Sequence, residues 1–205
     1  MMALFIVLWI MNAGPAVKRS VSGYFKDPRS YGRKGEGSQG ESDSDRKAAA
    51  TLQQSIEQAL RAMPDFDKLK DHIKLSVTNE GLRIDLMENQ QGLFFITGSP
   101  EPTAEGQKLL SVLAGELTRM PNSIVVEGHT DASPFRNARP DKGYSNWDLS
   151  TDRANAARRL LCAGGVAPER VVELRGFADH QVLEGATPEN PRNRRISIVV
   201  RLGAG

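Results

Sequence analysis

Residues 144–154 read YSNWDLSTDRA and lead into a helical pattern that we expect to span residues 151–163. With Ser150 or Asp148 as the N-cap, Arg153 would lie in the first turn of this helix. A cation in the first turn opposes the helix dipole by about 0.3–1 kcal/mol, so local stability does not explain Arg153. The planar guanidinium can bind a carboxylate through two parallel hydrogen bonds, which makes Arg153 a candidate anion receptor.

Helices and strands alternate on both sides of this stretch. Periodic apolar residues predict further helices over residues 47–63 and 103–120, and strands over 73–77, 82–86, 124–126, 171–174 and 196–200. The first two strands are separated by the turn Asn79-Glu80-Gly81 and should form a hairpin. The alternation predicts an α/β (α+β) two-layer sandwich, in which a mixed sheet is covered by helices on one face.

Four successive segments are expected along the chain. Residues 1–11 are uncharged and apolar but cover only about half of a bilayer, and the first basic residue, Lys18, follows them rather than preceding them as in a signal peptide. We therefore expect them to be the C-terminal part of a transmembrane helix. Residues 12–28 carry one apolar helical stripe, residues 29–46 have the Gly, Ser and charge content of a flexible linker, and residues 47–205 form one domain with its core at about 70–202.

The overall charge argues against nucleic acid as a partner. The chain has 27 Lys and Arg against 25 Asp and Glu, which leaves a formal net charge of +2. Proteins that hold nucleic acid by neutralising phosphates need a stronger positive field.

Polar residues follow the strand 124–126, and the end of a strand is a common place for a ligand site. A metal or hydrolase site is one hypothesis, with His129, Asp131, Asp179 and His180 as candidates. However, the His-x-Asp spacing is common, and the sequence has neither a Cys pair nor an H-E-x-x-H motif. We expect no enzymatic activity, no cofactor and no metal.

Three motifs together resemble a known family. GHTD at residues 128–131, YSNWDLSTDRA at 144–154 and NRRI at 193–196 occur in the order found in the OmpA-like peptidoglycan-binding domain. The resemblance covers roughly residues 124–200, and the second motif is the most specific of the three. It is closest to the MotB-type stator subunits of the flagellar motor, and residues 12–28 are similar to the plug segment of those subunits.

The resemblance implies a ligand and a role for each candidate residue. The ligand would be the diaminopimelate stem peptide of peptidoglycan, whose end carries an ammonium and a carboxylate. Asp131 would receive the ammonium or orient the ligand, Arg153 would pair with the carboxylate, and Thr130 and Asn146 would add hydrogen bonds. Arg194 and Arg195 would border the pocket, one facing the ligand and the other the fold. Two alternatives stay open at this stage: a mutual salt bridge between Asp131 and Arg153, and a solvated arginine pair at residues 194–195.

The same resemblance implies a non-covalent anchor for the motor stator, in the inner membrane with a single span and most of the chain in the periplasm. Its partners would be a MotA-like membrane subunit and a second copy of the chain. The ion-carrying aspartate of such subunits has no counterpart among residues 1–16, so we expect it before Met1. The alternative is an OmpA-like or Pal-like envelope anchor without a role in motility. A Pal-type lipoprotein would need a cysteine after the apolar start, and the only cysteine is Cys162.

Overall fold

The computed structural model describes residues 43–64, 66–133 and 143–202, and those from Ser44 onward belong to one compact unit. The larger elements are α4 (Asp43–Arg61), β1 (Ile73–Thr78), β2 (Gly81–Met87), α6 (Ala104–Thr118), β3 (Ile124–His129), α7 (Asn146–Ala163), β4 (Val171–Gly176) and β5 (Arg195–Arg201). The short elements are α5 (Phe66–Leu69), η1 (Lys70–His72), η2 (Pro168–Arg170) and η3 (Pro191–Asn193). None of the helices in these ranges has the length and apolar character needed to cross a membrane.

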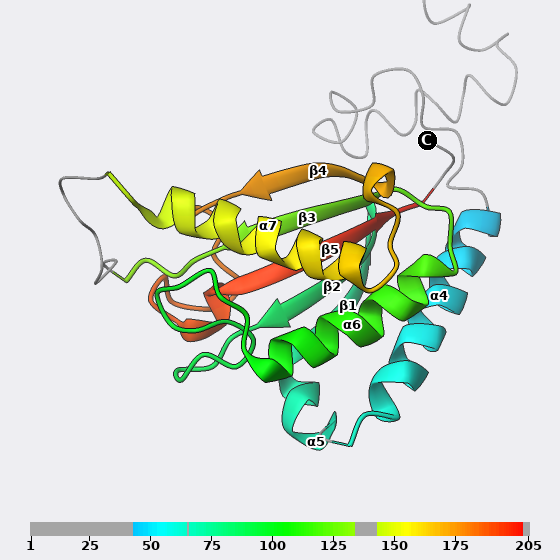
Figure 1. Cartoon of the computed structure of the whole chain (residues 1–205), viewed down its shortest axis with the longest axis horizontal. Helices are drawn as coiled ribbons and strands as arrows, with labels where there is room; N and C mark the ends of the chain where they lie inside the picture. Colours follow the sequence, from blue (N-terminus) through cyan, green and yellow to red (C-terminus); the bar gives the residue numbers. More distant parts are fainter. Residues whose placement is uncertain (1–42, 65, 134–142, 203–205) are drawn as a thin grey trace, which may run out of the picture. The chain divides into compact units, whose positions relative to one another are not determined.

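The five strands form a single mixed sheet with the order β1-β2-β5-β3-β4. β3 and β4 are parallel and are connected through α7, whereas the other neighbours are antiparallel. Helices α6 and α7 cover one face of the sheet, with α4 beside α6 (Figure 1). The predicted two-layer arrangement with a mixed sheet is therefore confirmed.

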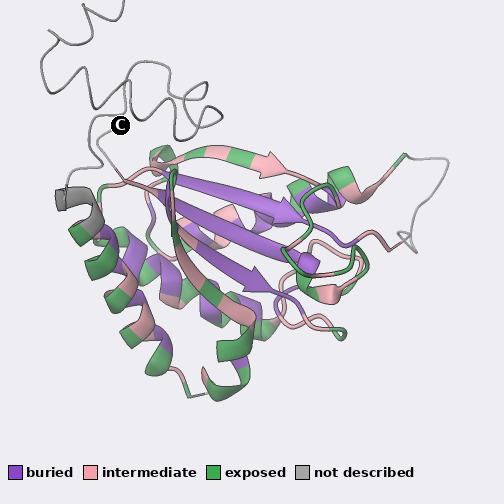
Figure 2. Cartoon of the chain, turned by 180° about the vertical axis from the view of Figure 1, so that it is seen from behind, coloured by how far each residue is buried: buried purple, intermediate pink, exposed green. Residues whose placement is uncertain are grey.

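The core lies between the sheet and the helices because apolar side chains alternate along the strands. On β2, Leu82, Ile84 and Leu86 are buried in this core, and they pair across the predicted hairpin with Val77, Leu75 and Ile73 of β1. In the view from behind, the three inner strands are buried along most of their length and the edge strands are not (Figure 2).

The intervening residues of the strands carry charges that pair with one another. Arg83 contacts Asp85 at 3.0 Å and Glu127 at 2.8 Å, and Arg175 contacts Glu127 at 2.9 Å. Burial by itself would raise the pKa of Glu127, but His129 at 3.7 Å and the two arginines lower it to about 2. A buried carboxylate is tolerated here because cations surround it.

Helix α7 approaches β3 closely at one glycine. A Cβ atom on Gly128 would lie 1.9 Å from the carbonyl oxygen of Ser150, so no larger residue fits without moving the backbone. Gly128 therefore sets the distance between α7 and the sheet.

Three boundaries differ from the sequence prediction. β3 continues to His129, so Glu127, Gly128 and His129 are strand residues rather than loop residues. α7 begins at Asn146, before the expected residue 151, because Ser145 is its N-cap and the Ser145 N–H donates to Asp148 over 2.8 Å. α4 begins at Asp43, inside the predicted linker. The predicted segments 1–11 and 12–28, and most of the linker, lie outside the described residues.

Candidate functional site

Five of the six predicted site residues gather where β3 ends and where α7 and β5 begin. Thr130 and Asp131 follow β3, Asn146 opens α7, and Arg194 directly precedes β5. Arg153 reaches the same region from further along α7, since the charges of both Asp131 and Arg194 influence its pKa. Residues that are far apart in the sequence are thus brought to one end of the sheet.

Asp131 forms an ion pair with Arg194. Nη1 of Arg194 donates to Oδ2 of Asp131 over 2.7 Å, and the two side chains are 15% and 7% exposed. The arginine is itself fixed, because Nη2 donates to the carbonyl oxygen of Asn89 over 2.5 Å. No described residue donates to the second carboxylate oxygen, Oδ1. One oxygen of Asp131 is therefore held by Arg194, and the other has no donor among the described residues.

Arg153 is buried and held by a loop that follows β2. Its Nε donates to the carbonyl oxygen of Ser99 over 2.9 Å and its Nη2 to that of Ile96 over 3.0 Å. Burial lowers the pKa of Arg153, and the carboxylates of Glu88 and Asp131 act in the opposite direction. The remaining nitrogen, Nη1, makes no hydrogen bond to a residue that the structure describes.

One expectation for Arg153 is wrong, and one alternative is excluded. The residue does not lie in the first turn of its helix, because α7 begins at Asn146. The argument from the unfavourable helix dipole therefore does not apply to Arg153. Nor does Arg153 form the alternative salt bridge with Asp131, which pairs with Arg194 instead.

Thr130 and Asn146 border the ion pair. The backbone N–H of Thr130 donates to the carbonyl oxygen of Ala178 over 2.7 Å, whereas its buried Oγ1 has no hydrogen-bond partner among the described residues. Nδ2 of Asn146 lies 3.4 Å from the carbonyl oxygen of Asp131, a long hydrogen bond. A buried hydroxyl without a partner is costly, which is consistent with a ligand or water molecule that completes it.

Arg195 is oriented differently from Arg194. It pairs across the sheet with His129 of β3, is 6% exposed, and donates to the carbonyl oxygen of Gln181 over 3.1 Å. Burial lowers its pKa to about 10. Arg194 contacts Asp131 whereas Arg195 belongs to the sheet, and the alternative of a solvated arginine pair is wrong because both side chains are largely shielded.

The residues of the metal hypothesis do not converge. His129 is fully buried and stacks on Phe177, with ring centroids 5.0 Å apart, whereas the ring of His180 packs against Trp147 at 4.9 Å. In the described ranges, no group of three or more His, Cys, Asp or Glu residues is placed to hold a metal ion.

Comparisons with known proteins agree with this fold and this placement of motifs. Residues 94–195 match the OmpA family. Motility protein B of Escherichia coli K12 is 31% identical over 230 aligned residues, which cover 98% of this chain and 74% of that protein. The chain belongs to the motility protein B (MotB) family.

Solved structures similar to this MotB family member share its fold. A putative MotB-like protein from Desulfovibrio vulgaris superposes with a TM-score of 0.58 at 18% identity, covering 78% of this chain and 99% of that one. The periplasmic domain of Helicobacter pylori MotB superposes with a TM-score of 0.53 at 20% identity, covering 64% and 80%. The architecture derived from the strand order is therefore that of MotB periplasmic domains.

Proposed function

We propose that this chain is the non-covalent peptidoglycan anchor of a flagellar motor stator. The proposal rests on two side-chain atoms that have no hydrogen-bond partner among the described residues, Oδ1 of Asp131 and Nη1 of Arg153. They occur in a chain of the MotB family. An acceptor and a cationic donor at one site suit a ligand that carries an ammonium and a carboxylate. The diaminopimelate stem peptide of peptidoglycan has both groups.

Binding would need little rearrangement of the protein. Asp131 is already oriented by Arg194, and Arg153 is already oriented by the carbonyl oxygens of Ile96 and Ser99. Side chains fixed before binding lose little conformational entropy when the ligand arrives. The hydroxyl of Thr130 and the amide of Asn146 would add hydrogen bonds at the border. No covalent step is required of any of these groups.

Sedimentation with purified sacculi tests the site. We expect Asp131→Ala and Arg153→Lys to lose most of the bound fraction, since the first removes the acceptor and the second cannot reproduce the guanidinium fork. Arg159→Ala is the matched control, because Arg159 is an exposed arginine on the same helix. If both site variants sediment with sacculi like the parent and the control, the assigned site is wrong.

Motility distinguishes the stator anchor from an envelope anchor of the OmpA or Pal type. In cells that lack their own MotB, a chimera that joins this domain to the membrane segment of the host's MotB should restore swimming, and Asp131→Ala should abolish it. Sacculus binding without restored swimming would favour the envelope anchor. A MotA-like membrane subunit, a homodimer and an inner-membrane location are further parts of the proposal. Co-purification from membranes and analytical ultracentrifugation of the full chain in detergent test them.

A further inference from the structure

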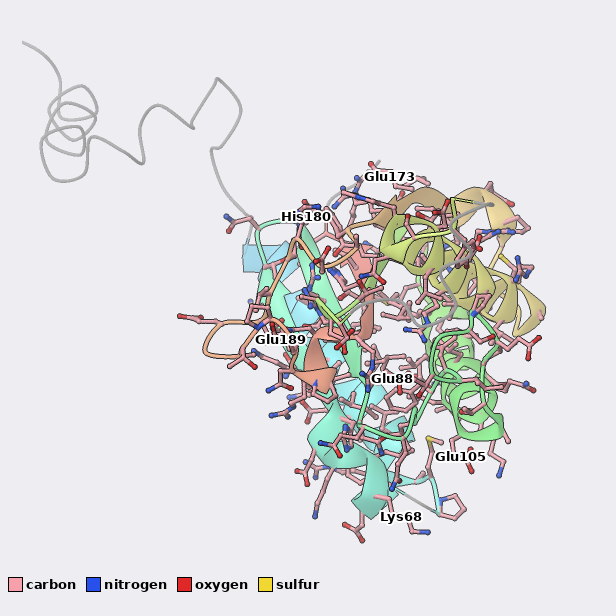
Figure 3. The ribbon with its side chains drawn as sticks, turned by 90° about the vertical axis from the view of Figure 1, so that its left-hand side faces the viewer. Lys68, Glu88, Glu105, Glu173, His180 and Glu189 are labelled. Carbon is pink, nitrogen blue, oxygen red and sulfur yellow. The ribbon has the colours of Figure 1, made fainter. Side chains whose placement is uncertain are left out.

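Glu88 is a buried carboxylate beside the proposed site. It directly follows β2 and is 3% exposed. In the view of Figure 3, Glu88 lies over the middle of the molecule, whereas Glu173 lies at its upper margin. A glutamate is almost never buried to this degree without specific partners.

Three consecutive backbone N–H groups are the partners of this carboxylate. The N–H groups of Leu93, Phe94 and Phe95 donate to it over 2.5, 3.1 and 2.8 Å, with Oε2 serving the first and Oε1 the last. Burial raises the pKa of Glu88, and the three amides and the charge of Arg153 oppose that rise. An acceptor with two oxygens is needed to satisfy three donors that point the same way. The carboxylate therefore fixes the course of the loop after β2.

The same loop turns its carbonyl groups toward Arg153. Immediately after the three bound amides, Ile96 and further along Ser99 supply the two oxygens that receive Nη2 and Nε of Arg153. The aromatic ring of Phe95 lies 5.8 Å from the guanidinium carbon. Glu88 thus binds the loop through the loop's N–H donors, and Arg153 binds it through the loop's carbonyl acceptors.

We propose that Glu88 is a positioning residue, which sets the orientation of the Arg153 guanidinium through the loop of residues 89–99. This role of Glu88 matters for ligand binding only if Arg153 has the function proposed above. Glu88 is also linked to the second arginine of the site, because its backbone N–H donates to the carbonyl oxygen of Arg194 over 2.8 Å. The sequence gives no sign of this role, since a single glutamate after a strand usually lies in solvent.

The test is Glu88→Gln in the full chain, with Glu101→Gln as the matched control. Glutamine has one acceptor oxygen, and its NH₂ group would face backbone donors. Glu101 follows this loop by two residues, but its side chain is exposed and makes no hydrogen bond to a described residue. The two variants therefore differ only in the contact under test.

The first readout is hydrogen exchange of the Arg153 Nε–H group, followed by ¹⁵N NMR without any ligand. In Glu88→Gln we expect exchange about tenfold faster than in the parent, the ratio expected for the loss of one hydrogen bond. Backbone amides of α7 should keep their protection, and Glu101→Gln should behave like the parent. Unchanged Nε–H exchange in Glu88→Gln would overturn the proposal, and so would an equal loss of protection along α7. Should Glu88→Gln fail to fold, the same comparison is made with Glu88→Asp, which keeps the charge on a shorter side chain.

The second readout is sacculus binding. Glu88→Gln should weaken it in the parent but add no further loss in Arg153→Lys, because two residues that act through one group are not additive. An equal further loss in both backgrounds would contradict the positioning role. Faster Nε–H exchange with undiminished sacculus binding has a different meaning. It leaves Glu88 as the positioning residue of Arg153 and refutes the function proposed for Arg153.

Discussion

Nη1 of Arg194 donates to Oδ2 of Asp131 over 2.7 Å, and both side chains are largely shielded from water. A shielded ion pair costs free energy when its charges leave water, and it recovers that cost only with good geometry and additional hydrogen bonds. Arg194 has such a bond to the carbonyl oxygen of Asn89. The pair therefore fixes the orientation of the Asp131 carboxylate and makes each partner dependent on the other.

Arg194→Ala should destabilise the domain by about 3 kcal/mol, because it leaves the Asp131 carboxylate shielded without its cation. Urea unfolding monitored by circular dichroism measures this change. Arg192→Ala is the control, since Arg192 is exposed and, among the described residues, its side chain donates only to the carbonyl oxygen of Asp71. A loss for Arg194→Ala no larger than that for the control would show that the pair does not contribute to stability.

Gly128→Ala should prevent normal folding or cost more than about 3 kcal/mol, because the added Cβ would overlap the carbonyl oxygen of Ser150. Gly115→Ala makes the same chemical change on α6, where nothing lies within 4 Å of the new Cβ, and should stabilise the domain by about 0.5–1 kcal/mol. Thermal unfolding of both variants compares them directly. A fully stable Gly128→Ala protein would contradict the close packing of α7 on β3.

Acid should destabilise the domain partly through Glu127. Its pKa in the folded protein is about 2, below its ordinary value of 4.5, so its contribution is present above about pH 4.5 and is lost as the pH falls toward 2. The stability lost between about pH 5 and about pH 2.5 should be smaller in Glu127→Gln than in the parent, by roughly 2 kcal/mol. Urea unfolding at the two pH values checks this, with the exposed Glu189→Gln as the control. Equal acid sensitivity of parent and Glu127→Gln would refute the assignment.

Ser145→Ala should cost about 1 kcal/mol, because Ser145 is the N-cap of α7 and its hydroxyl donates to Oδ2 of Asp148 over 2.7 Å. The exposed Ser111→Ala within α6 should be neutral or slightly stabilising, since alanine has the higher helix propensity. Differential scanning calorimetry of the two variants separates these effects. Similar melting temperatures for both would indicate that α7 begins elsewhere.

The architecture could be predicted because apolar periodicity is a local property of the sequence. The alternating spacing of Leu82, Ile84 and Leu86 predicts a half-buried strand. The helical spacing of apolar residues over 103–120 likewise predicts a helix. The start of α7 differs from the prediction because the sequence offers two serines as N-cap, Ser145 and Ser150. Ser145 is the N-cap because its N–H group donates to the Asp148 carboxylate. This arrangement is a capping box with aspartate in place of glutamate.

The partners within the site could not be predicted, because they depend on long-range contacts. Arg153 was singled out for its position in the helix, which was wrong, and for its motif, which remains the reason to place it in the site. The choice of Arg194 rather than Arg195 as the partner of Asp131 depends on the backbone just before β5. Glu88 has no periodicity or motif around it, and only the folded loop shows what its carboxylate binds.

The attachment of α4 has a mechanical consequence for an anchor. Any pull transmitted from the preceding chain enters the described domain through this helix, which is held by a stripe of apolar side chains and by the hydrogen bond from Ser55 to Glu116. The strands β3 and β5, next to the proposed site, are instead bonded to neighbours on both sides. Under load, α4 should peel away while those strands still hold together. The helix would then act as an extensible element, which lengthens the chain between the preceding segment and the domain before the peptidoglycan-binding site is disrupted.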